Sequence, residues 1–188
     1  MHRIPDSLIE RMQQGDREAL GEIYDIFAPS LYRYISFRIS HVQDREDTLS
    51  NVFLRVFESI AKGVKISNIR AFLYQSTRNA IIDYYRESTR NAAVVIEWNE
   101  ELLQNEQRNG SLSHSSPLFD ATMQNELIVR ELGRLKDEYR EILLLRYIED
   151  LEIAEIAEIM QKSSVAIRVT LHRALKALKK QMERTINI

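Results

Sequence analysis

The side chains best suited to chemistry gather near the end of the chain, where residues 162–184 hold seven Lys or Arg and one acidic residue. The apolar residues of this stretch recur at the spacing of one helical face and are expected to meet a core: Ile167, Leu171, Ala174, Leu175 and Leu178. The cations then lie on the opposite face, where they can contact nucleic-acid phosphates. A solvated basic helix near a C-terminus would show the same pattern, so charge alone leaves both interpretations open.

Other chemistries find little support in the residue types and their spacing. The His residues are isolated, Cys is absent, and there is no HExxH, glycine-rich phosphate loop or GxSxG motif. Acidic pairs such as Glu46 and Asp47 fall at helix starts, where the helix dipole accounts for them. We therefore expect no enzyme activity, no cofactor, no metal site and no small-molecule substrate.

The basic helix belongs to a pattern typical of a helix-turn-helix over residues 151–181. Apolar residues at helical spacing over 153–160 indicate a first short helix, residues 161–163 a turn, and Ser163 or Ser164 can cap the next helix. The N-terminal part of such a second helix reads base edges in the major groove, where Arg suits guanine and Val a thymine methyl. The exposed positions are Ser164, Val165, Arg168, Val169 and His172, and Arg173 and Lys176 continue the same face.

Charge is arranged in blocks, although the total is only −2. Residues 1–61 carry 7 basic and 10 acidic side chains, residues 62–90 carry 6 and 2, and residues 120–158 carry 5 and 11, before the basic block at the end. Two basic segments thus alternate with two acidic ones, which suggests two contacts with a polyanion. Ordinary solvated helix faces are the alternative for either basic block.

The first half of the chain shows helical periodicity over residues 6–14, 17–27 and 44–60, with another helix after an interruption at residues 28–30 (Ala-Pro-Ser). The helix over 44–60 has the most regular apolar stripe: Leu49, Val52, Phe53, Val56, Phe57 and Ile60. Its opposite side is polar except for Leu54, which we consider a candidate partner contact.

A short basic loop over residues 62–68 leads into a helix over about residues 69–87. The residues expected on its buried face are Ile69, Phe72, Leu73, Ser76, Ala80 and Tyr84. Arginines on its other faces alternate with Tyr74 and Tyr85, and basic and aromatic side chains together suit single-stranded nucleic acid. Tyrosines at helical spacing are also ordinary core residues, so this pattern supports either role.

Residues 88–121 differ in composition and are rich in Ser, Asn, Gln and Glu, which predicts a linker. An apolar island at residues 92–98 holds the only Trp and is able to dock on either module or on a partner. From residue 122 apolar residues return at helical spacing, with Asp137 as the expected N-cap of a helix.

These patterns predict an all-α fold of two small helical domains joined by a flexible linker. The expected boundaries are residues 8–88 for the first domain, 89–121 for the linker and 122–184 for the second domain. Five Gly and three Pro in 188 residues favour helices. No apolar run is long enough to span a membrane and the N-terminus lacks a signal-peptide core, so we expect a cytoplasmic protein without membrane insertion.

Three segments, in order, resemble bacterial RNA polymerase sigma factors of the sigma-70 family, in its extracytoplasmic-function (group IV) branch. Residues 15–20 (GDREAL) and 44–57 (DREDTLSNVFLRVF) are similar to regions 2.1 to 2.2, and residues 69–86 (IRAFLYQSTRNAIIDYYR) to regions 2.3 to 2.4. Residues 135–178 are similar to region 4. Ser50 and Asn51 stand where the family usually has Gln and Glu. The resemblance implies a factor that joins core polymerase and directs promoter-specific initiation of transcription.

The resemblance also implies roles for individual residues. The helix that docks on the clamp helices of the β′ subunit would carry Asp47, Leu49, Ser50, Asn51, Phe53 and Leu54. The promoter −10 element would be met and opened by Lys62, Lys65, Asn68, Arg78, Asn79, Asp83 and Arg86. The −35 element would be read by Ser164, Val165, Arg168, Val169, His172, Arg173 and Lys176. The acidic start of region 4 would face the β flap, and an anti-sigma factor is the family's usual regulator.

Two other functions fit part of the pattern. A two-module transcription regulator could use the helix-turn-helix without joining polymerase, although it has no need of the acidic and apolar helix at 44–57. A helical interaction module, such as a sigma-like adaptor, would lack specific DNA binding. Transcription from a promoter library with purified core polymerase separates the three functions.

Overall fold

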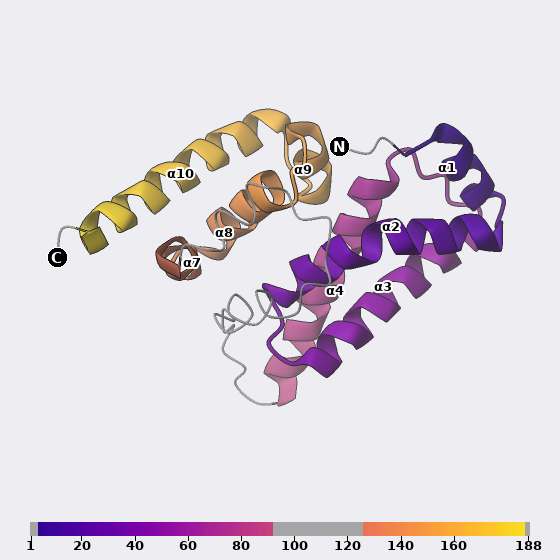
Figure 1. Cartoon of the computed structure of the whole chain (residues 1–188), viewed down its shortest axis with the longest axis horizontal. Helices are drawn as coiled ribbons and strands as arrows, with labels where there is room; N and C mark the ends of the chain where they lie inside the picture. Colours follow the sequence, from indigo (N-terminus) through magenta and orange to yellow (C-terminus); the bar gives the residue numbers. More distant parts are fainter. Residues whose placement is uncertain (1–3, 92–125, 187–188) are drawn as a thin grey trace. The chain divides into compact units, whose positions relative to one another are not determined.

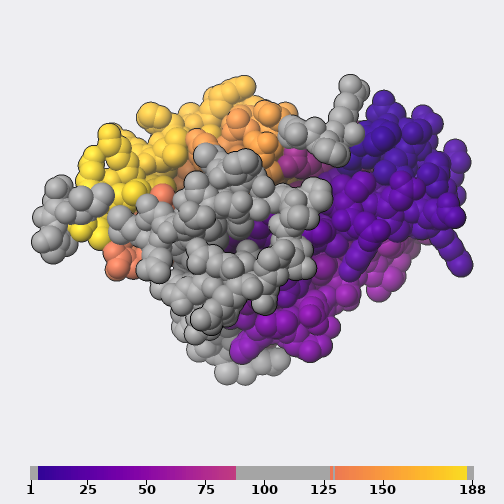
Figure 2. All heavy atoms as spheres, in the orientation of Figure 1, coloured from indigo at the N-terminus to yellow at the C-terminus, as the bar shows by residue number. Residues whose placement is uncertain are grey.

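The computed structural model describes residues 4–91 and 126–186 and divides the chain into two compact units, Met1–Glu97 and Trp98–Ile188. Within the described ranges all regular structure is helical, which confirms the predicted all-α class (Figure 1). Figure 2 shows all heavy atoms in the same orientation. The predicted linker from residue 92 onward, with the apolar island at 92–98, lies outside the described residues.

Unit 1 (residues 1–97) consists of α1 (Asp6–Gln13), α2 (Arg17–Ser36), α3 (Val42–Ala61) and α4 (Ile69–Asn91). The central helix α3 packs against both α2 and α4. Its predicted stripe is buried except for the half-buried Phe57, which confirms the helical period read from the sequence. The rings of Tyr34 on α2 and Tyr74 on α4 lie 5.6 Å apart inside the same core. Helix α4 continues to Asn91 and so includes the first residues of the predicted linker.

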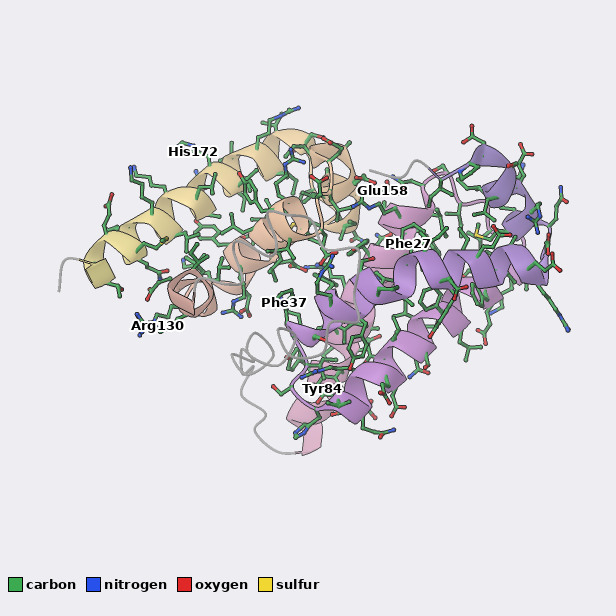
Figure 3. The ribbon with its side chains drawn as sticks, in the orientation of Figure 1. Phe27, Phe37, Tyr84, Arg130, Glu158 and His172 are labelled. Atoms are coloured by element: carbon green, nitrogen blue, oxygen red, sulfur yellow. The ribbon has the colours of Figure 1, made fainter. Side chains whose placement is uncertain are left out.

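Helix α2 runs unbroken through Pro29, so the predicted interruption at residues 28–30 was wrong. A proline inside a helix removes one backbone hydrogen bond and crowds the preceding turn, which is why the sequence suggested a break. Phe27 (labelled in Figure 3), Ala28 and Leu31 are nevertheless all buried. Burial of apolar residues on both sides of Pro29 therefore outweighs the local preference for a break.

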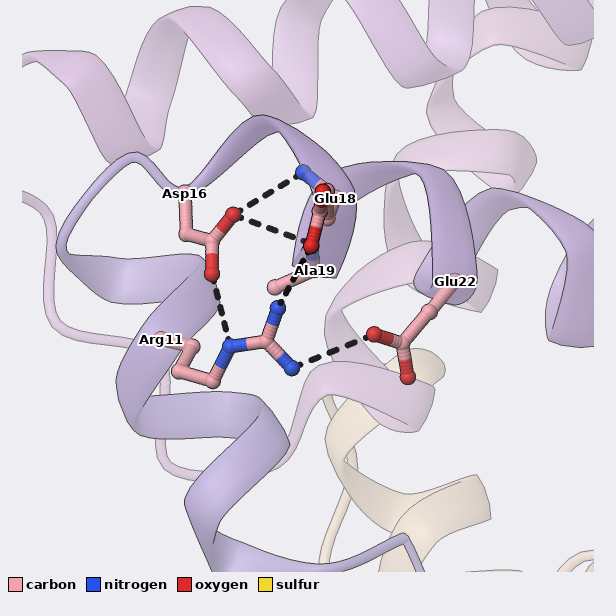
Figure 4. A network of polar contacts seen from close by, with 5 residues as sticks. All are labelled: Arg11, Asp16, Glu18, Ala19 and Glu22. Carbon is pink, nitrogen blue, oxygen red and sulfur yellow. Dashed lines mark hydrogen bonds and ion pairs between the residues drawn. The ribbon is translucent and has the colours of Figure 1, made fainter.

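The junction of α1 and α2 is held by a polar network centred on Asp16 (Figure 4). One carboxylate oxygen of Asp16 accepts hydrogen bonds from the backbone N–H groups of Glu18 and Ala19, which caps α2. The other oxygen lies 2.6 Å from Nε of Arg11. The Arg11 hydrogen bond, followed by the two backbone N–H groups, lowers the pKa of Asp16 despite partial desolvation. Asp16 raises the pKa of Arg11 in turn, so Arg11 stays charged throughout the usual range.

The Asp16→Asn variant is expected to be less stable than the wild type at neutral pH and equally stable in acid. Asn is as good an N-cap as Asp, so the variant removes the charge and keeps the cap. Because folding lowers the pKa of Asp16, its stabilising effect is present above the ordinary Asp pKa of about 3.9 and is lost as pH falls through the lower folded value. Thermal unfolding of both proteins between neutral pH and strong acid shows whether their melting temperatures become equal as the pH falls.

The control for this variant is Glu18→Gln, because Glu18 is 90% exposed and its carboxylate lies 3.7 Å from Arg11. Water and salt screen such a pair, so we expect almost no change in melting temperature. If the difference in melting temperature between Asp16→Asn and the wild type is the same at all pH values, the charge of Asp16 contributes nothing to the stability of the protein.

Unit 2 (residues 98–188) contains α7 (Glu126–Gly133), α8 (Asp137–Leu143), the π-helical turn η1 (Leu144–Ile148), α9 (Ile153–Ile159) and α10 (Ser164–Ile186). Helix α10 packs against α7, α8 and α9 in turn. Asp137 is the first helical residue of α8 and not its N-cap, which is Lys136 without a side-chain cap bond. The predicted cap at Asp137 was therefore wrong by one position.

Both units contain a buried arginine at the fourth residue of a helix, where it binds backbone carbonyls of the preceding turn. In unit 1, Arg45 on α3 is 3% exposed, with Nε 2.7 Å from the Ile39 oxygen and Nη2 2.6 Å from the Ser40 oxygen. In unit 2, Arg140 on α8 is buried and reaches three carbonyl oxygens, those of Leu132 (3.2 Å), Gly133 (2.6 Å) and Leu135 (3.0 Å). Each arginine thus donates to backbone carbonyls of the segment that precedes its helix.

Helix α10 extends beyond the predicted end of the helix-turn-helix at residue 181, and its last turn is tied to α7. Glu131 of α7 has a side chain that is 1% exposed and is bonded to Arg134 at 2.9 Å. The hydroxyl of Thr185 on α10 donates to the same carboxylate at 3.2 Å. The C-terminal end of the long helix is therefore anchored to α7.

Candidate nucleic-acid and partner-binding surfaces

The helix-turn-helix predicted for residues 151–181 is formed by α9, the turn after it and the start of α10. Gln161 adopts the left-handed conformation with φ 54°, which turns the chain sharply. The N–H of Lys162 then donates to the carbonyl of Ala157 at 2.9 Å, and the Ser163 hydroxyl accepts from the N–H of Ala166 at 3.2 Å. These contacts confirm both the predicted turn and the Ser163 cap.

The outward face of α10 carries the side chains predicted to read DNA. Val165 is 66% exposed and Val169 44% exposed, and the charged or polar members Arg168, His172, Arg173 and Lys176 are exposed too. His172 points away from α8 in Figure 3. Ser164 is half-buried at the first position of the helix. The structure therefore brings all seven predicted residues onto one helix, with six of them open to solvent.

One residue of the predicted core stripe of α10 was assigned wrongly. Ile167 and Ala174 are fully buried, and Leu171 and Leu178 are half-buried, but Leu175 is 40% exposed. At roughly 100° per residue, Leu175 stands at the edge of the stripe rather than at its centre. The apolar arc of α10 is consequently narrower than the sequence pattern suggested.

The cations of the basic block are not equally available. Lys162 forms an ion pair with Glu138 of α8, so it fastens the turn to the rest of unit 2. Arg168, Arg173 and Lys176 have no ion-pair partner among the residues that the structure describes. Unpaired cations on one exposed face are what contact with phosphates requires.

The Gln161→Gly variant is expected to stabilise unit 2 by about 0.5–1 kcal/mol, because a left-handed conformation is strained for any residue with a Cβ. The gain is reduced by the greater freedom of glycine in the unfolded chain. Urea unfolding of the full chain measures it. The control is Ala154→Gly at an exposed position within α9, which should lower stability by about 1 kcal/mol. Equal destabilisation by both glycines would contradict a strained turn.

A second basic surface in unit 1 starts at the loop between α3 and α4. Lys62 and Lys65 are exposed, and Gly63 has φ 82°, a value that favours glycine. The loop is anchored from inside, since Ile66 is buried and its carbonyl accepts from the Gln13 amide at 2.8 Å. The anchored loop therefore presents both lysines to solvent.

Asn68 at the end of this loop has a structural task. Its side-chain oxygen accepts a hydrogen bond from the N–H of Ala71 at 3.0 Å and so caps α4. The resemblance implied only a DNA contact for Asn68. Its spacing three residues before Ala71, at the start of a helical pattern, is the signal from which the cap could have been found.

The predicted residues of α4 share one side of the helix. Asn79, Asp83 and Arg86 are exposed, and Arg78 is half-buried. Asp83 lies 3.4 Å from Arg55 of α3 and 4.0 Å from Arg86, so this acid partly neutralises the basic surface and links α3 to α4.

The tyrosines of α4 serve the fold, which favours the core alternative over base stacking. Tyr74 is 1% exposed. The hydroxyl of Tyr84 donates to the carboxylate of Asp44 at 2.7 Å, and the hydroxyl of Tyr85 donates to the carbonyl of Arg38. Aromatic rings with these partners are fixed within unit 1.

The third surface is the polar side of α3. Asp47, Ser50, Asn51 and Leu54 are exposed, with Leu54 at 57%. Two other predicted contact residues are buried, Leu49 at 8% and Phe53 at 3%, and the Phe53 ring lies 4.6 Å from that of Tyr24. The structure thus excludes Leu49 and Phe53 from the exposed face, and they support the helix from within because they belong to its apolar stripe.

Two kinds of site were searched for across the described residues. No group of three or more His, Asp or Glu side chains in those residues could hold a metal ion. No described helix combines the length and the apolar character that crossing a membrane requires.

Comparisons with known proteins agree with this division into two units. A family model described as "Sigma-70 region 2" matches residues 23–91, and one described as "Sigma-70, region 4" matches residues 125–178. The chain is 28% identical to RNA polymerase sigma factor YlaC of Bacillus subtilis over 169 residues, covering 90% of this chain and 95% of that protein. It is also 28% identical to ECF RNA polymerase sigma factor SigM of the same organism, over 168 residues that cover 89% and 98%.

The fold resembles a solved structure of the sigma factor RpoE in complex with the anti-sigma factor NepR from Bartonella quintana. The TM-score is 0.61 at 16% identity, with 87% of this chain and 96% of that chain covered. This likeness concerns the fold. Together, the two matched regions in the expected order and the full-length relatives show that the chain belongs to the extracytoplasmic-function branch of the sigma-70 family.

Proposed function

We propose that this protein binds the core of bacterial RNA polymerase and directs promoter-specific initiation of transcription. One observation carries the proposal: a single chain of this family has both an exposed acidic and polar face on α3 and an exposed basic face on the helix-turn-helix. Its role is recruitment and DNA opening, with no catalytic step of its own, and it acts where polymerase and DNA are, in the cytoplasm.

The polymerase contact is assigned to the exposed side of α3. Asp47, Ser50, Asn51 and Leu54 would meet the β′ clamp helices. Leu54 is the one large apolar side chain on this face, at 57% exposure, and an apolar centre within a polar rim is the usual arrangement of a protein interface. Leu49 and Phe53 would keep α3 in position from the core. The acidic residues at the start of region 4 would face the β flap.

The two promoter contacts are assigned to the two basic surfaces. The −10 element would meet Lys62 and Lys65 in the loop, followed by Arg78, Asn79 and Arg86 on α4, with Asn68 and Asp83 positioning this surface. The −35 element would meet the N-terminal half of α10. Separating DNA strands at −10 costs a few kcal/mol per unstacked step, which binding of the opened strand and the polymerase contacts offset.

Run-off transcription with purified core polymerase on a promoter library tests the function. We expect transcripts from a subset of templates only when the protein is present. DNA binding without any transcript would instead support a regulator that does not join polymerase, and neither binding nor transcript would support an adaptor.

Regulation by an anti-sigma factor fits the same surfaces. Such a partner would cover the exposed side of α3, the basic face of α10 or both, and thereby compete with polymerase or DNA. The proposal predicts that a bound anti-sigma factor protects these helices from hydrogen exchange.

A further inference from the structure

The outward face of α10 has an apolar crest at its N-terminal end. Val165 and Val169, which we call the valine pair, stand one helical turn apart and are 66% and 44% exposed. At roughly 100° per residue, both lie nearly opposite the buried Ile167. The same geometry places Arg168 toward one edge of this face and Arg173 toward the other.

Folding of unit 2 does not account for the valine pair. Both side chains project from the helix on the side away from its core, and β-branched residues lower helix stability relative to alanine. Exposed apolar side chains flanked by unpaired cations suit a partner that combines apolar groups with negative charge on both sides.

The major groove of DNA has this arrangement. The 5-methyl group of thymine is the only apolar group on a base edge in that groove, and phosphates line both of its sides. When such a helix lies in the major groove, the residues at the centre of its outward face reach the base edges. The residues at the two sides of that face reach the sugar-phosphate backbones of the two strands. Charge complementarity therefore points to duplex DNA as the occupant of this face.

We propose that the valine pair recognises thymine 5-methyl groups within the −35 element, while Arg168 and Arg173 contact the backbones on either side. This inference rests on the proposed function and specifies the base chemistry of its −35 contact. Cytosine and uracil lack the methyl group, so the valine pair selects thymine at one or two positions.

Replacement of single thymines by deoxyuridine tests the assignment, because it removes one methyl and leaves base pairing intact. The reconstituted holoenzyme is bound to a promoter found in the library, with each −35 thymine replaced in turn. We expect binding to weaken about three- to fivefold at one or two positions, the effect of exposing one methyl-sized group. In Val165→Ala or Val169→Ala holoenzyme, thymine and uracil promoters should then bind equally at the matching position.

Leu175→Ala is the matched control, since Leu175 is an exposed apolar residue of the same helix at 40% but lies off the crest. It should keep the full thymine-to-uracil difference. A promoter without any uracil-sensitive thymine at −35, or sensitivity that persists in both valine variants, overturns the assignment and leaves the proposed function intact. Absence of any promoter-directed transcript overturns both.

Discussion

Replacing Arg140 by alanine is expected to destabilise unit 2 by about 3–5 kcal/mol, since hydrogen bonds from a charged group contribute about 1.5–3 kcal/mol each. The guanidinium lies within 3.2 Å of three backbone oxygens, and it is 6% exposed, so water cannot readily replace it. A domain of this size has a total stability of about 5–15 kcal/mol, so the loss would bring unit 2 close to unfolding. Urea unfolding of the full chain, followed by circular dichroism, should show an earlier transition of about two fifths of the helical signal, the share of unit 2 among the described helices.

Two further variants make this test specific. Arg184→Ala removes an exposed arginine from α10 and should change stability by less than about 0.5 kcal/mol. Arg140→Lys keeps the positive charge but replaces the planar guanidinium, which binds three carbonyl oxygens, by a single ammonium group. Its loss of stability should lie between those of the other two variants. If Arg140→Ala changes stability no more than Arg184→Ala does, the three carbonyl groups find other hydrogen-bond partners.

The Leu54→Asp variant is expected to weaken binding to core polymerase about 30-fold or more, the effect of losing an interface residue worth about 2 kcal/mol. A carboxylate placed where an apolar side chain was buried in the interface must also lose its water, which costs further binding free energy. Because Leu54 is exposed, the core of unit 1 should not change. Titration of core polymerase with labelled protein measures the affinity, and run-off transcription should fall in parallel at low protein concentration.

Val42→Asp is the matched control for Leu54→Asp. Val42 is 56% exposed on the same helix, and it is the first residue of α3, where a carboxylate favours the helix dipole. It lies about a third of a turn away from Leu54 around the helix axis. Equal polymerase affinity of the two variants would mean that the exposed side of α3 is not the docking face.

The helical period predicted which residues of α3 are exposed better than the resemblance did. The period of the sequence placed Leu54 opposite the apolar stripe, and it is exposed. The resemblance grouped Leu49 and Phe53 with it, but both side chains belong to the buried stripe, and the ring of Phe53 lies against that of Tyr24 on α2. The spacing of apolar residues along the chain therefore located the helix. The position of each residue around the helix axis decided whether its side chain is exposed and can contact a partner.

Buried polar residues were the least predictable part of the chain. Arg45 and Arg140 belong to a residue type that is usually exposed, yet each is buried and donates to backbone carbonyls of the segment that precedes its helix. The sequence left Tyr85 open to base stacking or to a core role, and its hydroxyl binds a carbonyl of the segment after α2. Such pairings join residues whose separation in the sequence carries no regular period.

Helical class, the order of the two modules and the outward face of α10 all follow from the sequence, because a 3.6-residue period and the placement of Gly and charge act locally. The tertiary structure alone decided that α2 continues through Pro29, that Leu175 leaves the core, and that Lys162 pairs with Glu138. Each of these depends on the burial or charge of a neighbouring element, which can outweigh a local preference of a few kcal/mol.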